Sequence, residues 1–365
     1  MHPRNCGSRF QVPKSPGELR SHRVMNPLVS ILIPAYNAER YIGETIKSAL
    51  TQTWAKKEII IVDDGSRDDT LRIARQFSSP TVSVLTQPNS GASVARNKAF
   101  SVCQGEYIQW LDADDLLASD KISRQMATAA QCANERALLS CAWGHFIFRA
   151  HKAIFNPTPL WSDLTPIEWA LRNLGESLWM QPANWLVSRK ISETAGPWDV
   201  RLSLDDDGEY FSRVVLASES VRFVPDARIF YRRTPASLSY VGRSTKKLES
   251  LFLSIRLQIE HLRAIEDTLR VREACVKCLQ NYLVWFYPER PEIVAQAEHL
   301  AKELGGKLDG PRLPLKYAWI QKAFGWSAAK QAQAAYSQMK LSMFRSWDKA
   351  LSRLETRPSG HLSAF

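Results

Sequence analysis

The sequence predicts an α/β fold in which a mostly parallel sheet is flanked by helices and followed by a region of helices alone. From residue 28 to about residue 240, short runs rich in Ile, Val and Leu alternate with segments of helical periodicity. Several of these runs end in clusters of Asp, Gly, Pro or Asn, which is typical of strands that end at the edge of a sheet. After residue 242 the periodicity is helical throughout. These observations divide the chain into a basic segment over 1–26, an α/β domain over 27–240 and a helical region over 241–365.

The first half of the α/β domain is expected to hold four buried strands separated by three helices. The strands are predicted at Leu28–Ile33, Glu58–Val62, Val82–Leu85 and Glu106–Leu111. The helices are predicted at Tyr41–Trp54, Asp68–Phe77 and Gly91–Cys103, with Ser66 as the N-cap of the second. Ligands bind beyond the carboxyl ends of the strands in such sheets. Three polar clusters fall there and predict one site: Pro34–Asn37, Asp63–Ser66 and Asp112–Asp115.

The pattern over residues 140–240 is mixed and is interpreted as the second half of the same domain. Strands are predicted at Trp143–Phe148, Asn184–Ser188 and Val221–Tyr231, and helices at 166–174 and from Asp207 onwards. In the C-terminal region helices are predicted at 248–262, 292–304, 315–324 and 327–355. Residues 1–26 contain Pro and Gly without periodicity and are expected to be disordered, with Met25 as an alternative start of the protein.

The formal net charge of +11 is concentrated at the two ends of the chain. Residues 1–26 hold five Lys and Arg against one acidic residue, residues 241–365 hold 20 against 12, and residues 27–240 hold 23 against 24. Basic ends indicate either an anionic partner, such as a membrane surface, or solvated surface charge. Nucleic-acid binding is not expected, because no basic stripe with interleaved aromatic residues is present. Six scattered Cys, no 18-residue apolar run and no signal-like apolar segment predict a cytoplasmic protein.

Acidic residues follow two of the predicted strands. Asp112 and Asp114 lie two positions apart after an apolar strand, so their carboxylates are able to face one hard cation that prefers oxygen ligands. Asp63 and Asp64 precede Gly65, which permits the backbone angles of a tight turn. Each cluster alone is also explained as a solvated turn that caps a helix.

Taken together, four ordered motifs resemble those of the family 2 glycosyltransferases, whose catalytic domain has the GT-A fold. The motifs are Val29–Asn37, Glu58–Ser66, Asn89–Asn97 and Gly105–Asp115. The resemblance covers about residues 28–240 and leaves the first 26 residues and the helical region outside it.

The resemblance implies a donor site for a nucleotide-sugar. Its residues would be Pro34, Ala35, Tyr36, Glu39, Asp64, Arg96, Asp112, Ala113 and Asp114. The first strand end would line the base and ribose, with Glu39 nearby, and Asp64 would hydrogen-bond the pyrimidine. Asp112 and Asp114 match the family's D-x-D, which meets the ribose and a divalent metal, Mn²⁺ or Mg²⁺, on the diphosphate. For Arg96 and its neighbour Asn97, a role in supporting the site is equally consistent with the sequence.

The family's general base lies in a later acidic pair that is followed by Arg. Aligning Arg213 with that Arg makes Asp207 the implied catalytic base and Asp206 its acidic neighbour. A sugar hydroxyl is a poor nucleophile, so a carboxylate in hydrogen-bond reach is needed to take its proton. Repulsion within Asp205, Asp206 and Asp207 should raise the pKa of at least one of them. The alternatives are that another of the three is the base, or that the cluster only favours a helix N-terminus.

Three further features carry less information. Thr234 stands where family members often have a metal-reaching His, which leaves the third metal ligand to water or brings Arg232 or Arg233 near the diphosphate. Cys275 and Cys278 have C-x-x-C spacing without a second pair, so buried packing is expected. Five tryptophans lie in the part of the domain that meets the acceptor in this family, where some would stack on sugar: Trp143, Trp161, Trp169, Trp179 and Trp185.

The sequence therefore predicts an inverting glycosyltransferase that moves a sugar, most consistently from a UDP-sugar, to a hydroxyl of a glycan or lipid-linked acceptor in envelope or extracellular polysaccharide synthesis. The rival hypothesis is an inactive GT-A scaffold that only binds nucleotide, for which Thr234 is the best support. The basic helical region predicts contact with the inner face of a membrane, or packing and homo-oligomer formation.

Overall fold

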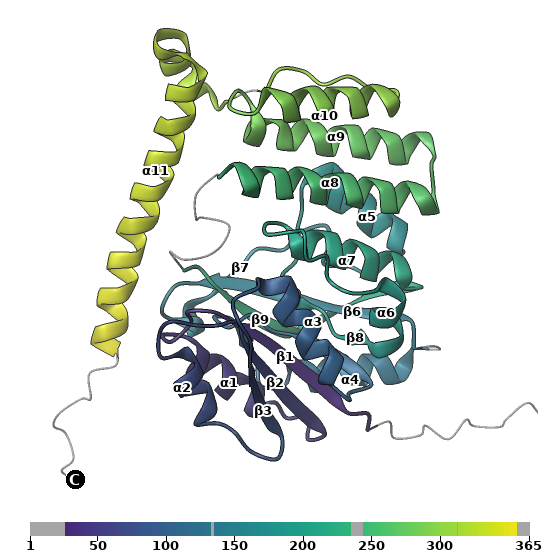
Figure 1. Cartoon of the computed structure of the whole chain (residues 1–365), viewed down its shortest axis with the longest axis vertical. Helices are drawn as coiled ribbons and strands as arrows, with labels where there is room; N and C mark the ends of the chain where they lie inside the picture. The colour runs from purple at the N-terminus through teal and green to yellow at the C-terminus, as the bar shows by residue number, and fades with distance from the viewer. Residues whose placement is uncertain (1–25, 133–134, 235–243, 312, 356–365) are drawn as a thin grey trace, which may run out of the picture.

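The computed structural model describes residues 26–132, 135–234, 244–311 and 313–355 (Figure 1). The predictions for a disordered segment over 1–26 and for Met25 as a start concern residues that lie, except for residue 26, outside this range. An α/β domain occupies one end of the molecule and a stack of helices the other, with one long helix standing beside both (Figure 1).

A five-stranded sheet with the order β3-β2-β1-β4-β8 forms the centre of the α/β domain. Its strands are β1 (Val29–Ala35), β2 (Lys57–Asp63), β3 (Val82–Thr86), β4 (Tyr107–Trp110) and β8 (Val187–Ser188). The first four are parallel, and β8 is antiparallel to β4. All four predicted strands of the first half are confirmed. The runs of β1, β2 and β4 are buried on both faces, as central parallel strands require, whereas in the edge strand β3 only Val82 is buried.

Alternate residues of these strands pack on helices on opposite faces of the sheet. Ile31 and Ile61 pack with the helices on one face, and Leu32 and Ile60 with those on the other. The first face is covered by α1 (Ile42–Leu50), α2 (Thr70–Arg75) and α4 (Lys121–Gln131), and the second by α3 (Ala92–Val102), α6 (Arg189–Ala195) and α7 (Asp206–Ala217).

The prediction that Ser66 caps the second helix is wrong. That helix, α2, begins at Thr70, and its N-cap Asp69 makes no side-chain capping bond. Ser66 Oγ instead accepts the backbone N–H of Asn37 at 3.0 Å. The hydroxyl that favours a cap is used to join two loops, which sequence spacing alone does not reveal.

A second sheet with the order β5-β9-β6-β7 extends the domain. Its strands are β5 (Leu116–Leu117), β6 (Ala137–Phe146), β7 (Ile154–Phe155) and β9 (Ser220–Arg232). The parallel pair β6 and β9 shifts register at Cys141 and Ala142. The predicted strand Trp143–Phe148 is therefore only the end of β6, while the predictions near Val221–Tyr231 and for a helix at 166–174, α5 (Pro166–Glu176), are confirmed.

The helical region continues the fold with α8 (Thr245–Ile265), α9 (Leu269–Phe286) and α10 (Pro291–Glu303), stacked over α5 and α7 (Figure 1). Buried Leu251 and Ile255 of α8 share a hydrophobic core with Ala170 and Leu174 of α5. Cys275 and Cys278 are buried in that core, as expected.

The last helix, α11 (Ala318–Glu355), has non-helical angles at Gly325, with φ 83° and ψ 175°. This kink falls between the two helices predicted at 315–324 and 327–355. Across the described part of the chain, no helix combines the length and apolarity needed to span a bilayer.

Candidate donor and catalytic site

The three polar clusters at the carboxyl ends of β1, β2 and β4 lie together, as predicted. Asp64 donates its backbone N–H to the carbonyl of Ala35 at 2.8 Å, which ties the end of β2 to the end of β1. Thr45 Oγ1 of α1 donates to the carbonyl of Ala113 at 2.9 Å. Ala35 is buried and Pro34 half-buried, while the ring of Tyr36 is 46% exposed at this edge.

Asp64 organises the loop that leads into α3. Its Oδ1 accepts from Gln87 Nε2 at 2.7 Å and from Ser90 N at 2.9 Å, and its Oδ2 accepts from Gly91 N at 2.8 Å and from Asn89 Nδ2 at 3.2 Å. Both oxygens thus have two donors within the chain, so a contact with a pyrimidine base would require one of these bonds to move.

Glu39 holds the neighbouring pair of loops. Its Oε2 accepts the backbone N–H of Asp69 at 3.1 Å, and its own N–H donates to Asp68 Oδ2 at 3.1 Å. The side chain is exposed at the same sheet edge as Tyr36.

The D-x-D carboxylates lie in an acidic and partly buried setting. Burial, and then repulsion from Asp112, raise the pKa of Asp114 to about 7. Burial and the same acidic neighbours raise the pKa of Asp115 well above its ordinary value. Thr234 Oγ1 donates to Asp114 Oδ2 at 3.4 Å, so the residue in the place of the family's His does reach this carboxylate. Among the described residues, no group of three His, Cys, Asp or Glu is arranged to hold a metal.

Arg232 holds this turn through hydrogen bonds to Asp114 and Asp115. Its Nε donates to the carbonyl of Asp114 at 2.8 Å, its backbone N–H to Asp115 Oδ1 at 2.8 Å, and its Nη2 to Glu44 Oε2 at 2.6 Å. The side chain is 4% exposed and also lies against the ring of Phe146. These bonds use Nε and Nη2 of its guanidinium, and contact of Arg232 with a diphosphate stays a prediction.

Arg96 joins the D-x-D turn to the acidic cluster of α7. Its Nη2 lies 2.9 Å from Asp112 Oδ1 and its Nη1 lies 2.6 Å from Asp206 Oδ2. Burial opposes its charge, but Asp206 and Asp112 together raise its pKa. The guanidinium also lies 4.3 Å from the ring centre of Trp198. Residues predicted to bind the donor and to perform catalysis are thereby brought into one network by a buried cation.

Asp207 belongs to the same acidic cluster. Burial, then repulsion from Asp206 and Asp205, raise its pKa to about 8, against a smaller opposing effect of Arg96. The preceding Asp205 has left-handed angles, φ 59° and ψ 30°, at the N-cap of α7. Its carboxylate lies over Gly208, where a Cβ would come within 2.4 Å of Asp205 Oδ1. A glycine at 208 is therefore required by this turn.

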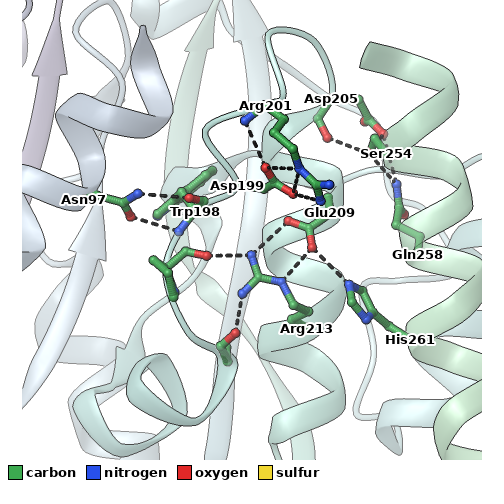
Figure 2. Close-up of polar contacts among 12 residues, drawn as sticks. Asn97, Trp198, Asp199, Arg201, Asp205, Glu209, Arg213, Ser254, Gln258 and His261 are labelled. Atoms are coloured by element: carbon green, nitrogen blue, oxygen red, sulfur yellow. Dashed lines mark hydrogen bonds and ion pairs between the residues drawn. The ribbon is translucent and has the colours of Figure 1, made fainter. Parts of the chain in front are cut away.

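Polar side chains on one side of α8 hold that turn (Figure 2). Ser254 Oγ donates to Asp205 Oδ2 at 2.7 Å, and Gln258 Nε2 donates to the same oxygen at 2.9 Å. One turn earlier, Ser250 Oγ accepts the backbone N–H groups of Ser203 and Leu204 at 2.8 and 3.0 Å. The sequence analysis missed these residues, although Ser250, Ser254 and Gln258 recur every four positions of a helix whose other side is apolar.

The next residue on this polar side of α8, His261, contacts a buried ion pair on α7 (Figure 2). Glu209 accepts from Arg213 Nε at 2.6 Å and Nη2 at 2.9 Å, and lies 3.1 Å from His261 Nε2. Arg213, used above only to align the motif, also donates to the carbonyls of Ala195 and Pro197. These contacts fix the first turn of α7, which carries Asp206 and Asp207.

Aromatic side chains form a platform beside the end of β9. The ring centres of Trp143 and Trp179 lie 4.6 Å apart, and that of Tyr231 lies 5.9 Å from Trp179. Trp179 is 48% exposed, whereas Trp169 and Trp185 are buried in the core. Tyr231 directly precedes Arg232, so the platform adjoins the D-x-D turn.

Comparison with known proteins finds similarity over the part of the chain that contains Asp64, Arg96, Asp112 and Asp114. Residues 30–140 match the family model for glycosyl transferase family 2. The Escherichia coli chondroitin synthase is 48% identical over 98 residues, which are 26% of this chain and 14% of that protein. The Bacillus subtilis putative teichuronic acid biosynthesis glycosyltransferase TuaG is 45% identical over 103 residues, or 27% and 41% of the two chains. The match thus spans less than half of either relative.

Among solved structures, S. aureus TarS 1-349 in complex with UDP-GlcNAc aligns with a TM-score of 0.62 at 17% identity, covering 76% of this chain and 81% of that one. The fold is therefore of the GT-A class, a mostly parallel α/β sheet followed by helices. The similarity to glycosyl transferase family 2 extends over residues 30–140.

Proposed function

We propose that the protein transfers a sugar from a nucleotide-diphosphate donor, a UDP-sugar in the first instance, to a hydroxyl acceptor with inversion at the anomeric carbon. The observation that carries this proposal is the network in which Arg96 joins Asp112 of the D-x-D turn to Asp206, the neighbour of Asp207. The match of residues 30–140 to the family 2 model and the UDP-GlcNAc named with the TarS structure support the donor class.

In the proposed reaction Asp207 accepts the proton of the acceptor hydroxyl, whose oxygen forms the new bond to the anomeric carbon. The bond from that carbon to the diphosphate breaks in the same step, and the diphosphate leaves with the electron pair. The raised pKa of Asp207 suits a base that must take up a proton near neutral pH. Arg96 keeps Asp206 paired, so that Asp206 does not compete for the proton.

The acidic turn also fits a divalent cation, Mn²⁺ or Mg²⁺, which we propose as the cofactor. Asp112 and Asp114 would hold it. A cation between them would offset the repulsion from Asp112 and the cost of burying a charged Asp114, the two effects that raise the pKa of Asp114. Two protein carboxylates suit an ion that keeps water and phosphate oxygens in its shell. When bound, such an ion neutralises charge on a departing diphosphate.

We further propose that the acceptor is a sugar hydroxyl of a glycan or lipid-linked glycan. The exposed ring of Trp179, backed by Trp143 and Tyr231, offers an apolar face of the kind on which sugar rings stack. The names of the chondroitin synthase and teichuronic acid relatives support polysaccharide synthesis as the setting.

The experiment is nucleotide release from a panel of UDP-, GDP- and dTDP-sugars with crude glycan acceptors, in Mn²⁺, Mg²⁺ or EDTA. Asp207→Asn is expected to lower the transfer rate by about 10²- to 10⁴-fold while donor binding persists, because only proton removal is lost. The matched control is Asp226→Asn, whose side chain is 72% exposed on β9 and which should transfer at the wild-type rate.

Nucleotide binding without release in the wild-type protein would instead favour the inactive scaffold. Equal rates for Asp207→Asn and Asp226→Asn would remove Asp207 from the mechanism. Retention of anomeric configuration in the product, measured by NMR coupling constants, would contradict the single displacement.

A further inference from the structure

The outward side of α11 carries large apolar side chains that remain about half exposed or more, although the Lys316 ammonium lies 4.5 Å from the ring centre of Tyr336. They recur at steps of three, four, four and seven residues and therefore share one side of the helix. They are Tyr336, Met339, Met343, Trp347 and Leu354, with exposed fractions between 47% for Tyr336 and 67% for Trp347. We call these five residues the α11 stripe. An exposed apolar surface of this extent on one helix indicates an interaction site.

The opposite side of α11 is fastened to the α/β domain. Asp348 accepts from Arg149 Nε at 2.7 Å and from the backbone N–H of Phe148 at 2.9 Å. Glu355 accepts from Arg149 Nη1 at 2.8 Å and lies 3.3 Å from His151. These contacts give α11 a fixed inner side and leave the α11 stripe on the outer one.

Charge is divided between the two sides in the same way. Residues 313–355 contain seven Lys and Arg against two acidic residues, Asp348 and Glu355. Both acidic side chains are the ones paired with Arg149 on the inner side. Exposed lysines are spread along the helix and the turn before it: Lys316, Lys322, Lys340 and Lys349. The accessible surface of α11 is therefore apolar and cationic.

Further large apolar side chains are exposed before the kink at Gly325. Leu315, Trp319 and Phe324 are 90%, 65% and 71% exposed. Tryptophan and phenylalanine beside lysines are the composition of helices that lie in the headgroup region of a bilayer, where the rings enter the apolar layer and the ammonium groups reach the phosphates.

We propose that α11 docks on the surface of an anionic lipid bilayer through the α11 stripe and its flanking lysines. A second copy of the chain fits this surface poorly, because two such helices would bring like charges together without an acidic partner on either accessible side. An anionic bilayer supplies both the apolar layer and the negative charge that this surface lacks.

Docking in this way would hold the candidate site close to the bilayer. The segment that receives Asp348 directly follows β6, and Phe146 at the end of β6 lies against the guanidinium of Arg232. Arg232 in turn bonds the backbone of Asp114 in the D-x-D turn. The inner side of α11 is thus connected through a short series of contacts to the acidic site.

The test is co-sedimentation of the full chain with vesicles of phosphatidylcholine alone or mixed with phosphatidylglycerol. The wild-type protein should bind the anionic vesicles, and binding should weaken as salt is added. Lys340→Glu, next to Met339 on the side of the α11 stripe, should weaken binding by at least about tenfold, because a lysine near such a surface contributes about fivefold and the new carboxylate is repelled. Met343→Gln with Trp347→Gln should weaken it by a similar factor of about tenfold through lost apolar burial.

Ile265→Gln is the matched control, since Ile265 is an exposed apolar residue at the end of α8 rather than on α11. It should bind anionic vesicles as the wild type does, and circular dichroism should confirm that every variant is folded. The proposal would be overturned if the wild-type protein did not bind anionic vesicles, or if both α11 variants bound them as strongly as the wild type does. A concentration-dependent dimer in sedimentation velocity that Trp347→Gln dissolves, without vesicle binding, would assign the surface to a second copy.

Discussion

Two helices of the C-terminal region, α8 and α11, use the same kind of sequence in opposite ways. Helix α8 buries its apolar side in the core that it shares with α5, and uses Ser250, Ser254 and Gln258 to hold the turn at Asp205. Helix α11 is fastened by its polar side and leaves its apolar side exposed. The difference shows that membership of the helical region does not define a role: α8 is part of the candidate site's support, whereas α11 is suited to a partner outside the chain.

The largest expected effect comes from removing the two α8 donors to Asp205, in Ser254→Ala with Gln258→Leu. The half-buried Asp205 carboxylate would lose both of the α8 side chains that donate to its Oδ2, and hydrogen bonds to charged groups contribute about 1.5 to 3 kcal/mol each. We expect the free energy of unfolding, measured with urea, to fall by about 2 to 4 kcal/mol. Since the turn positions Asp207, kcat should fall by about 100-fold, with KM for the donor nearly unchanged.

The matched control for this variant is Ser337→Ala on α11, where the hydroxyl bonds only the carbonyl of Gln333 in an exposed turn. It should change neither kcat nor stability measurably. A normal kcat in the α8 variant, with stability lowered as expected, would mean that α8 supports the fold without positioning the base.

A second prediction concerns stability and pH at the turn that α8 holds. The folded pKa of Asp207 is raised to about 8, so the fold favours its neutral form. The contribution of this neutral carboxyl to the free energy of unfolding is fully present at pH values below the ordinary pKa of Asp207. It is lost as the pH rises through the folded pKa of about 8. The groups that act on it are Asp206, Asp205, Arg96 and Asp112. Without donor or metal, Asp207→Asn should therefore unfold at higher urea than the wild type at pH 9, by at least about 1 kcal/mol.

The two proteins should have nearly equal stability below about pH 3, where Asp207 is mostly protonated in both the folded and the unfolded wild-type chain. A stability difference that does not change with pH would mean that the carboxylate is not held in its neutral form. The corresponding variant of an exposed carboxyl, Asp226→Asn, should show no such pH dependence.

The sequence predicted the central sheet and most of the residues that gather at its edge. The four parallel strands were recognisable because apolar runs such as Ile59–Val62 are too short for a helix and end at polar turns. Four ordered motifs then located Asp64 and Asp112, and the later acidic pair aligned on Arg213 located Asp207. The roles of these residues remain predictions. The start of β6 was missed, because Ala137–Cys141 fits a buried helix as well as a strand.

What the sequence did not reveal depends on contacts between distant segments. Asp205 and Ser254 are 49 positions apart, and only the packing of α8 on α7 brings them together. The same carboxylate lies within 2.4 Å of where a Cβ at Gly208 would be, so the tight fit at Gly208 also depends on how Asp205 is held. Ser66 was assigned to the wrong role for the same reason, because its partner Asn37 comes from another strand end.

The smallest expected effect comes from the α11 stripe. Met343→Gln with Trp347→Gln should leave the free energy of unfolding within about 0.5 kcal/mol of the wild type, because side chains that stay exposed contribute little burial on folding. Transfer to a water-soluble acceptor should also be unchanged, while binding to anionic vesicles falls. A loss of more than about 1 kcal/mol in urea unfolding would mean that these side chains pack against the protein itself in solution. Helix α11 would then be a second supporting helix like α8, and the contrast between the two would fail.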